Sequence, residues 1–191
     1  MPVSTAYRND SHNCINAVGG SNCVISLGSN VPGSWGAPIA TLHRALHILE
    51  QNQVFIIARS LIYRTLPHSG AGLMPEFYNA VILARTNLPL GGLLRVVKAV
   101  ERKAGRRSRA RWGARPLDLD IIDYGSRALN WPALNQPGGP LVLPHPLMHE
   151  RGFVLVPLAE IAPHWRHPVL GLTAGVLLRR HPALKRGIAP A

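Results

Sequence analysis

The stretch LDLDIIDYG (117–125) follows a proline and ends in glycine, and its apolar residues are typical of a buried β-strand. Three upstream runs have the same character, NCVISLGSN (22–30), VFIIARSLIY (54–63) and FYNAVILAR (77–85). Apolar residues that step by three and four predict helices over about 37–51 and 90–103. The order β-α-β-β-α-β predicts an α+β fold, a ferredoxin-like α/β sandwich with a mostly antiparallel sheet and helices packed on its faces. Short helices are expected further on, near 147–150, 154–161 and 173–180.

Length and composition predict one domain without a membrane span or a disulfide framework. The chain has 191 residues and two cysteines, and no apolar run approaches the ~20 residues that a spanning helix needs. Residues 1–20 are expected to be a disordered extension rather than a signal peptide, 21–182 the domain, and 183–191 a frayed tail. Residues 131–140 read as an insertion rich in proline and glycine. We expect a cytoplasmic location.

The positive charge of the chain is concentrated in one region. The formal net charge is +12, and basic residues cluster between Arg95 and Arg115, where Glu101 is the only acid. Such a cluster suits any polyanion, so charge alone leaves RNA and a nucleotide triphosphate both open as partners.

Asp118 and Asp120 lie two residues apart in the predicted strand, so both side chains should leave the same face. Paired carboxylates favour Mg²⁺, which binds through one or two carboxylates together with substrate phosphates. The alternative is a solvated strand face at the edge of the sheet. Strict alternation would put Asp123 on the opposite face, as a turn acid.

The loop before this strand is rich in arginine, with Trp112 and Gly113 among the residues Arg106, Arg107, Arg109, Arg111 and Arg115. Arginine forks bind phosphate oxygens bidentately and stabilise transition-state charge. Alternatively, the loop contacts RNA with Trp112 stacked on a base. Two neighbouring carboxylates favour the nucleotide, because an RNA-binding site has little use for them.

Two further patterns suggest binding groups. Phe77 and Asn79 share a strand face, where they could stack a flat heterocycle and bond to its edge, or simply be a core aromatic beside a strand-end amide. His145 and Arg151 could both reach a phosphate, although an isolated histidine is more often structural. No Walker or dinucleotide-binding glycine motif occurs in the sequence, so nucleotide chemistry would need another kind of site.

Together these residues resemble the hydroxymethyl-dihydropterin pyrophosphokinase family, from about residue 22 to 180. The motifs that carry the resemblance are Leu27-Gly28-Ser29-Asn30, Tyr63-Arg64-Thr65, Phe77-x-Asn79-Ala80, Gly105-Arg106, Arg111-Trp112-Gly113-x-Arg115-x-x-Asp118-Leu119-Asp120-Ile121, Pro144-His145 and Arg151-Gly152-Phe153. The resemblance implies a transferase that moves pyrophosphate from ATP to 6-hydroxymethyl-7,8-dihydropterin in folate biosynthesis and releases AMP.

The resemblance also implies a role for each matching residue. Two Mg²⁺ ions would bind to Asp118 and Asp120, and the catalytic set would be these two with Arg106 and Arg115. The ATP-binding residues would be Lys98, Glu101, Arg106, Arg115, Ile121, His145 and Arg151. The pterin-binding residues would be Thr65, Leu66, Phe77, Asn79, Trp112, Asp118 and Phe153. We expect a monomer without a nucleic-acid or membrane partner.

The sequence departs from the family pattern in the arginine loop. Ser108 stands where the family has a second arginine, and Arg107 or Arg109 could substitute for it. Two alternatives to the enzyme stay open. The positive charge would also suit a basic RNA-binding module, and Ser108 would suit a degenerate homologue that binds ATP without catalysis.

Overall fold

The structure, a computed structural model, describes residues 20–66, 75–106, 115–131 and 140–191. The strands are β1 (Ser21–Ser29), β2 (Val54–Arg59), β3 (Tyr63–Thr65), β4 (Phe77–Thr86), β5 (Asp118–Tyr124) and β6 (Ile188–Pro190). The α-helices are α1 (Pro38–Gln51), α2 (Leu90–Lys103), α3 (Gly152–Ile161) and α4 (Ala174–Arg180), and two short 3₁₀ helices are η2 (Met148–Glu150) and η3 (Pro182–Lys185).

The strands form one sheet in the order β5-β1-β4-β3-β6, with β2 also paired to β4. Every strand pair among the described residues is antiparallel. The two long central strands, β1 and β4, pair over their whole length from Ser21 opposite Thr86 to Ser29 opposite Tyr78. This order confirms the predicted ferredoxin-like arrangement.

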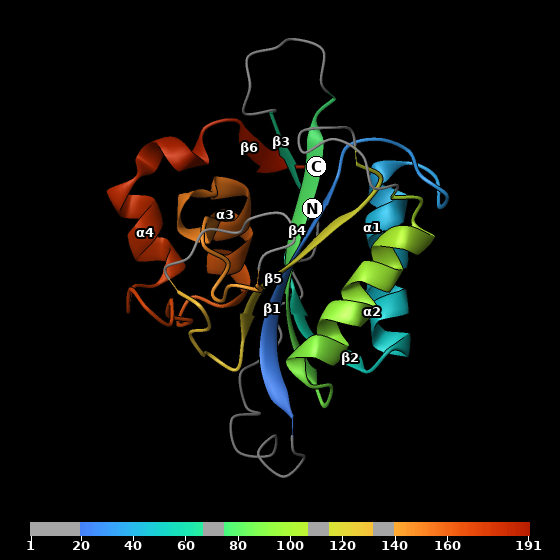
Figure 1. Cartoon of the computed structure of the whole chain (residues 1–191). Coiled ribbons are helices and arrows are strands. Elements are labelled where there is room, and N and C mark those ends of the chain that lie inside the picture. The colour runs from blue at the N-terminus through green and yellow to red at the C-terminus, as the bar shows by residue number, and fades with distance from the viewer. Residues whose placement is uncertain (1–19, 67–74, 107–114, 132–139) are drawn as a thin grey trace.

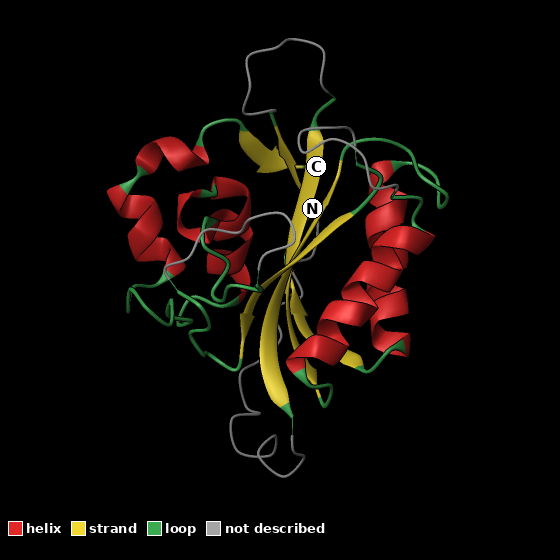
Figure 2. Ribbon diagram, in the orientation of Figure 1, coloured by secondary structure: helices red, strands yellow, loops and turns green. Residues whose placement is uncertain are grey.

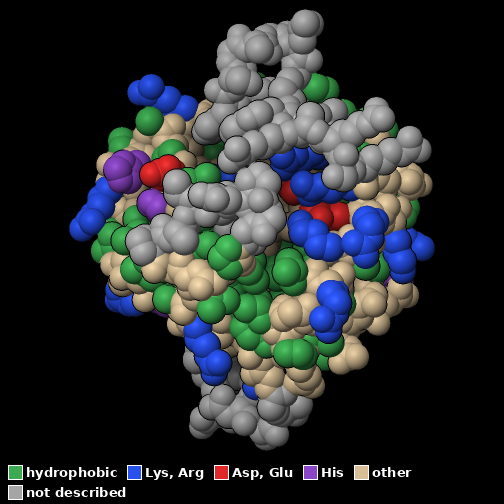
Figure 3. All heavy atoms as spheres, viewed as in Figure 1, with side chains coloured by type: hydrophobic (Ala, Val, Ile, Leu, Met, Phe, Trp, Pro, Cys, Tyr) green, Lys and Arg blue, Asp and Glu red, His purple; other side chains and the backbone are tan. Residues whose placement is uncertain are grey.

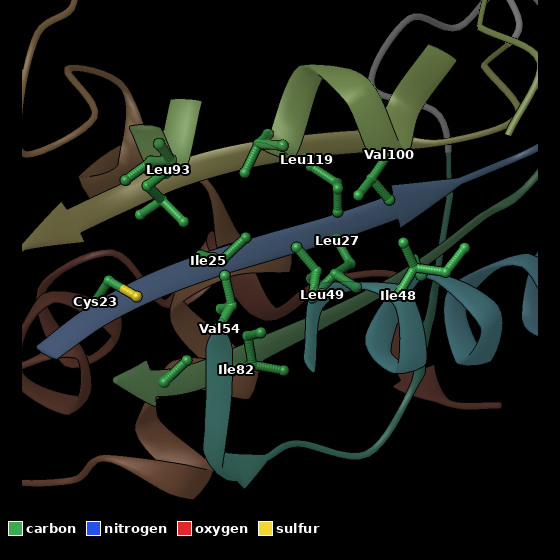
Figure 4. Close-up of a cluster of buried hydrophobic side chains, with 14 of the residues drawn as sticks. Cys23, Ile25, Leu27, Ile48, Leu49, Val54, Ile82, Leu93, Val100 and Leu119 are labelled. Atoms are coloured by element: carbon green, nitrogen blue, oxygen red, sulfur yellow. The ribbon is translucent and has the colours of Figure 1, made fainter. Parts of the chain in front are cut away.

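Helices cover the sheet on both faces, with α1 and α2 on one side and α3 and α4 on the other (Figures 1 and 2). The first face buries strand residues such as Ile25, Leu27 and Leu119 against Leu49 of α1 and Leu93 of α2 (Figure 4). The second face buries a separate cluster from alternate strand positions and the later helices, including Val24, Val81, Ile122, Leu155, Leu158 and Leu177. Alternation along each strand thus supplies both cores. Among the described residues, no helix is long and apolar enough to cross a membrane.

The strand predicted over 54–63 divides into β2 and β3. The register of β2 against β4 shifts between Ile56 and Ala58, which marks a β-bulge. After it, the Ser60 hydroxyl accepts a hydrogen bond from the Val81 amide at 3.0 Å, in place of a backbone acceptor. The Ser60 side chain therefore interrupts the strand, although the apolar sequence continues beyond it.

A second bulge changes the expected position of Asp123. The register of β5 against β1 places Asp123 opposite Val24 but Ile121 opposite Ile25, so one extra residue lies between them. Asp123 is buried and accepts a hydrogen bond from Nε1 of Trp165 at 2.9 Å, on the side of α3 and α4. The prediction that Asp123 faces away from Asp120 was wrong, because the bulge breaks the alternation.

The C-terminal residues are ordered rather than frayed. They form η3 and then β6, which pairs with β3 along the edge of the sheet. The frayed tail predicted for 183–191 is therefore corrected by this pairing. The expectations for 1–20 and for the 131–140 insertion lie almost wholly outside the described residues.

Candidate active site

The site begins at the N-terminal end of β5, where Asp118 and Asp120 share the face that α3 covers. Arg106 donates to Oδ1 of Asp118, and Arg115 donates to Oδ2. Burial opposes ionisation of Asp118, but the two guanidinium groups outweigh it and hold the pKa of this carboxyl below its usual range. The carboxylate is thus kept charged, with each oxygen paired to a guanidinium group.

Glu101 supports this end of β5 from the last turns of α2. It is only 2% exposed, and Oε1 accepts the backbone N–H of Leu119 at 2.9 Å, on the edge of β5 that faces away from β1. Lys98 Nζ donates to Oε2 at 2.8 Å, and Arg106 donates to Oε1. Arg106 is therefore held between Glu101 and Asp118, so the predicted residues at the nucleotide end do come together.

A second charged group surrounds Asp120. Its Oδ2 lies 3.5 Å from Nη1 of Arg151, and the same nitrogen lies 3.4 Å from Nε2 of His145. Burial lowers the pKa of His145, while Asp120 opposes this shift. The buried imidazole is held by its backbone, which donates to Ile122 O at 2.9 Å. Arg151 also lies over the Phe153 ring, 5.6 Å from its centroid, as in a cation–π contact.

Gly28 of β1 separates the carboxylates from the predicted heterocycle site. It pairs with Asp118 on one side and with Asn79 on the other. A Cβ at Gly28 would lie 2.9 Å from Oδ1 of Asn79 and 4.0 Å from Cβ of Asp118. Gly28 thus puts no side chain between an acidic group and an amide, and a methyl group there would meet the amide oxygen.

The heterocycle side is built on β3 and β4. Asn79 Nδ2 donates to Oγ1 of Thr65 at 2.8 Å, and Phe77 is the cross-strand partner of Thr65. Leu66, just beyond β3, is exposed at 59%. Phe77 and Asn79 lie on the same sheet face as Asp118, because each strand alternates and the pairs are in register.

Two residues of the first motif have a role that sequence reasoning did not assign. Asn30 Oδ1 accepts the Arg115 amide at 2.7 Å, and the Asn30 amide donates to Arg115 O at 3.1 Å. Ser29 Oγ donates to Pro116 O at 2.6 Å. Both side chains are buried. They fix the chain where the arginine loop returns to β5; a polar pair directly after a buried strand was the available signal.

Some predicted site residues are placed differently or lie outside the described residues. The side chain of Ile121 packs in the α1/α2 core, so only its backbone is available to a ligand. Trp112, Arg107, Ser108, Arg109 and Arg111 lie outside the described residues. On the visible face, Figure 3 shows acidic and basic side chains gathered side by side next to α2.

The donor set fits magnesium bound together with a nucleotide. No group of three or more His, Cys, Asp or Glu placed to hold a metal occurs among the described residues. Asp118 and Asp120 offer two hard oxygen donors, and phosphate oxygens would complete the coordination of Mg²⁺. Three arginines beside the same two carboxylates would bind the remaining phosphate charge. The residues present therefore suit Mg²⁺ that arrives with a polyphosphate.

Three curated proteins show what this chain is similar to. The chain is 38% identical over 140 residues to 2-amino-4-hydroxy-6-hydroxymethyldihydropteridine pyrophosphokinase of Methylorubrum extorquens, covering 73% of this chain and 81% of that protein. It is 44% identical over 99 residues to the Synechocystis protein of the same name, covering 52% and 47%. Against the folate synthesis bifunctional protein of Arabidopsis thaliana it is 35% identical, covering 72% and 23%, so it spans a quarter to a half of some relatives.

Solved structures show the same fold. Plasmodium falciparum HPPK-DHPS with pteroate matches with a TM-score of 0.68 at 16% identity, covering 90% of this chain and 48% of that one. The family model for 7,8-dihydro-6-hydroxymethylpterin-pyrophosphokinase matches residues 24–163. The expected resemblance is thereby confirmed, and this chain belongs to the 7,8-dihydro-6-hydroxymethylpterin-pyrophosphokinase (HPPK) family.

Proposed function

We propose that this chain transfers a pyrophosphoryl group from ATP to 6-hydroxymethyl-7,8-dihydropterin and releases AMP. The observation that carries the proposal is the arrangement around Gly28. Two carboxylates with three arginines lie on one side of it, and an amide with an aromatic ring lies on the other. A polyphosphate suits the first group, and a flat heterocycle with hydrogen-bonding edges suits the second.

In this reaction the hydroxymethyl oxygen forms a bond to the β-phosphorus of ATP. The bond from that phosphorus to the oxygen shared with the α-phosphate breaks, and AMP leaves. Such transfers depend on positioning and on stabilising negative charge more than on covalent catalysis. When bound with ATP, two Mg²⁺ ions at Asp118 and Asp120 would neutralise phosphate charge.

The arginines supply the remaining positive charge. Arg106, Arg115 and Arg151 are paired with Asp118 and Asp120 in the structure. ATP would offer them phosphate oxygens instead, which frees the carboxylates as metal donors. Because Glu101 and Asn30 hold Arg106 and the Arg115 backbone, these cations change partner with little reorganisation.

On the other side, Asn79 and Thr65 would bind the edge of the pterin while Phe77 and Phe153 stack on its faces. Because Gly28 has no side chain, none would stand at this position between the hydroxymethyl group and the phosphates. We include Trp112 and the Leu66 backbone in the pterin set, and Lys98 and the Ile121 backbone in the nucleotide set. The monomeric state and the cytoplasmic location stay predictions.

The test is AMP formation from ATP and Mg²⁺, with and without reduced hydroxymethyl pterin. Pterin-dependent AMP without free phosphate supports the proposal. A folded sample that binds ATP but forms no AMP would instead indicate a degenerate homologue. A sample that does not bind ATP, but shifts RNA in a salt-dependent way that Asp118→Asn leaves unchanged, would indicate the RNA-binding alternative.

A further inference from the structure

We propose that residues 182–191 act as a brace for the pterin site. They would hold the two sides of that site in position, one at Thr65 and Phe77 and the other at Phe153. They would therefore control pterin affinity rather than ATP affinity. The inference rests on the proposed function for its substrate. It concerns a segment beyond residues 24–163, the part that the family model matches.

One end of the brace is the pairing of β6 with β3. Tyr63, Arg64 and Thr65 lie opposite Pro190, Ala189 and Ile188. The pairing continues at both ends: the Leu66 amide donates to Gly187 O at 3.3 Å, and the Ala191 amide donates to Ile62 O at 2.9 Å. The whole outer edge of β3, up to Thr65 and Leu66, is therefore bonded to the C-terminal segment.

The register also explains why a proline is tolerated in β6. Antiparallel pairs alternate between hydrogen-bonded and non-hydrogen-bonded positions. Since the pairs 62–191 and 66–187 are bonded, the pair Arg64–Ala189 is bonded as well, and Pro190 occupies a non-bonded position. The missing N–H of Pro190 therefore removes no hydrogen bond between β3 and β6.

The other end of the brace contacts the start of α3. A Cβ at Gly152 would lie 1.7 Å from Leu184 O and 2.9 Å from Cδ1 of Ile188. Real Cβ atoms do not approach a carbonyl oxygen so closely, so the glycine is what allows η3 and β6 to pack here. Gly152 stands between Arg151 and Phe153, and Leu184 also packs on the apolar cluster of α3 and α4.

One short segment thus touches both walls of the pterin side. It pairs with Thr65 and bonds to Leu66, next to Phe77 and Asn79, and it packs on the backbone just before Phe153. The metal carboxylates are on β5, at the opposite end of the strand order from β6. Loss of the brace should therefore move Phe153 relative to Phe77. Asp118 and Asp120 should stay in place, and the pairing with Asp120 should retain Arg151.

The experiment compares Ala189→Pro with Ala189→Ser in the full-length chain. Proline removes the N–H at a bonded position, whereas serine keeps it at this exposed site. We expect Ala189→Pro to raise the pterin KM about tenfold, while the ATP KM and the kcat at saturating pterin stay within about twofold. Deletion of 187–191 should act in the same direction and more strongly, and Ala189→Ser should match the parent chain.

Amide hydrogen exchange provides a readout that does not depend on activity. In Ala189→Pro, the Leu66 amide and the first turn of α3 should lose protection, while the Leu119 amide, bonded to Glu101, should keep it. Unchanged exchange at Leu66 and α3 would overturn the brace, and so would an ATP KM that rises as much as the pterin KM. If Ala189→Pro shows this exchange pattern but the parent chain forms no pterin-dependent AMP, the proposed function alone would be overturned.

Discussion

Gly28 and Asn79 lie directly opposite each other in β1 and β4, so close that a Cβ on the glycine would be 2.9 Å from the amide oxygen. Asn79 is only 6% exposed, and its Nδ2 donates a hydrogen bond to Oγ1 of Thr65 at 2.8 Å. The amide therefore cannot move without losing that hydrogen bond. Gly28 and Thr65 together therefore fix the position from which the Asn79 amide can hydrogen-bond to a ligand.

Gly28→Ala should weaken pterin binding. The added methyl group pushes the Asn79 amide away from its position and fills the space toward Asp118. We expect the pterin KM to rise about tenfold, which corresponds to about 1.4 kcal/mol, with the ATP KM nearly unchanged. Steady-state kinetics with each substrate varied in turn would measure this.

The matched control is Gly175→Ala in α4, where the nearest group to the new Cβ is the flexible end of Arg179 at 3.7 Å. This change should leave both KM values unaltered and slightly stabilise the helix. Equal pterin KM values for Gly28→Ala and the parent chain would contradict the assignment of the Asn79 amide to pterin binding.

Asp120→Asn should greatly lower turnover, while Asp123→Asn should not. Both residues are on β5, and the bulge places both on the side of α3. Asp120 lies beside Arg151 in the site. Asp123 instead accepts a hydrogen bond from Trp165, and an asparagine at 123 keeps an oxygen that can accept it. We expect Asp120→Asn to lose about a hundredfold or more in kcat, or about 2.7 kcal/mol.

AMP formation over a magnesium titration is the measurement. A turnover by Asp120→Asn that approaches the parent value at saturating Mg²⁺ would refute the metal assignment. A loss of similar size in Asp123→Asn would show that the effect comes from disturbing the strand rather than the site.

Asn30→Ala should lower kcat through Arg115. The substitution removes the side-chain oxygen that accepts from the part-buried Arg115 amide at 2.7 Å, which should cost about 1 kcal/mol of stability. It also loosens the backbone that carries the guanidinium group on Asp118. We expect kcat to fall about tenfold, and Asn30→Asp, which keeps the acceptor oxygen, to restore most of it. A variant that loses stability but keeps the parent kcat well below its melting temperature would show that Asn30 supports only the fold.

The sheet and the main helices could be predicted because their signal is local. Apolar residues at helical spacing, as in 37–51 and 90–103, and β-branched runs such as 77–85, need no knowledge of the partner. The shared face of Asp118 and Asp120 likewise follows from alternation within one strand.

The missed features depend on distant partners. The bulge near Ile122 is defined by pairing with β1, nearly a hundred residues earlier. β6 is three residues long and contains a proline, so its own sequence argues against a strand, and only the edge of β3 makes it one. The role of Asn30 depends on a hydrogen bond to a residue 85 positions away. Periodicity along the chain does not carry such information.

The stability of the fold should fall in mild acid because of His167. Its side chain is fully buried, and Nδ1 accepts hydrogen bonds from the amides of Val169 and Leu170 at 3.3 and 3.1 Å. Burial, and secondarily the nearby His149, lower the pKa of His167 from 6.5 to about 4. Between these two values the unfolded chain binds more protons than the folded chain, so the free energy of unfolding rises with pH.

The stabilisation is complete above about pH 6.5 and is lost as the pH falls toward 4. With about 1.4 kcal/mol for each pKa unit, the loss is at most about 3.5 kcal/mol. Urea unfolding at pH 7.5, 6 and 5 would measure it. His167→Asn keeps an acceptor for the two amides but does not titrate, so it should be less stable at pH 7.5 and depend less on pH. His43→Asn, at an exposed position of α1, should keep the parent slope. Identical slopes in His167→Asn and the parent chain would show that another group causes the acid sensitivity.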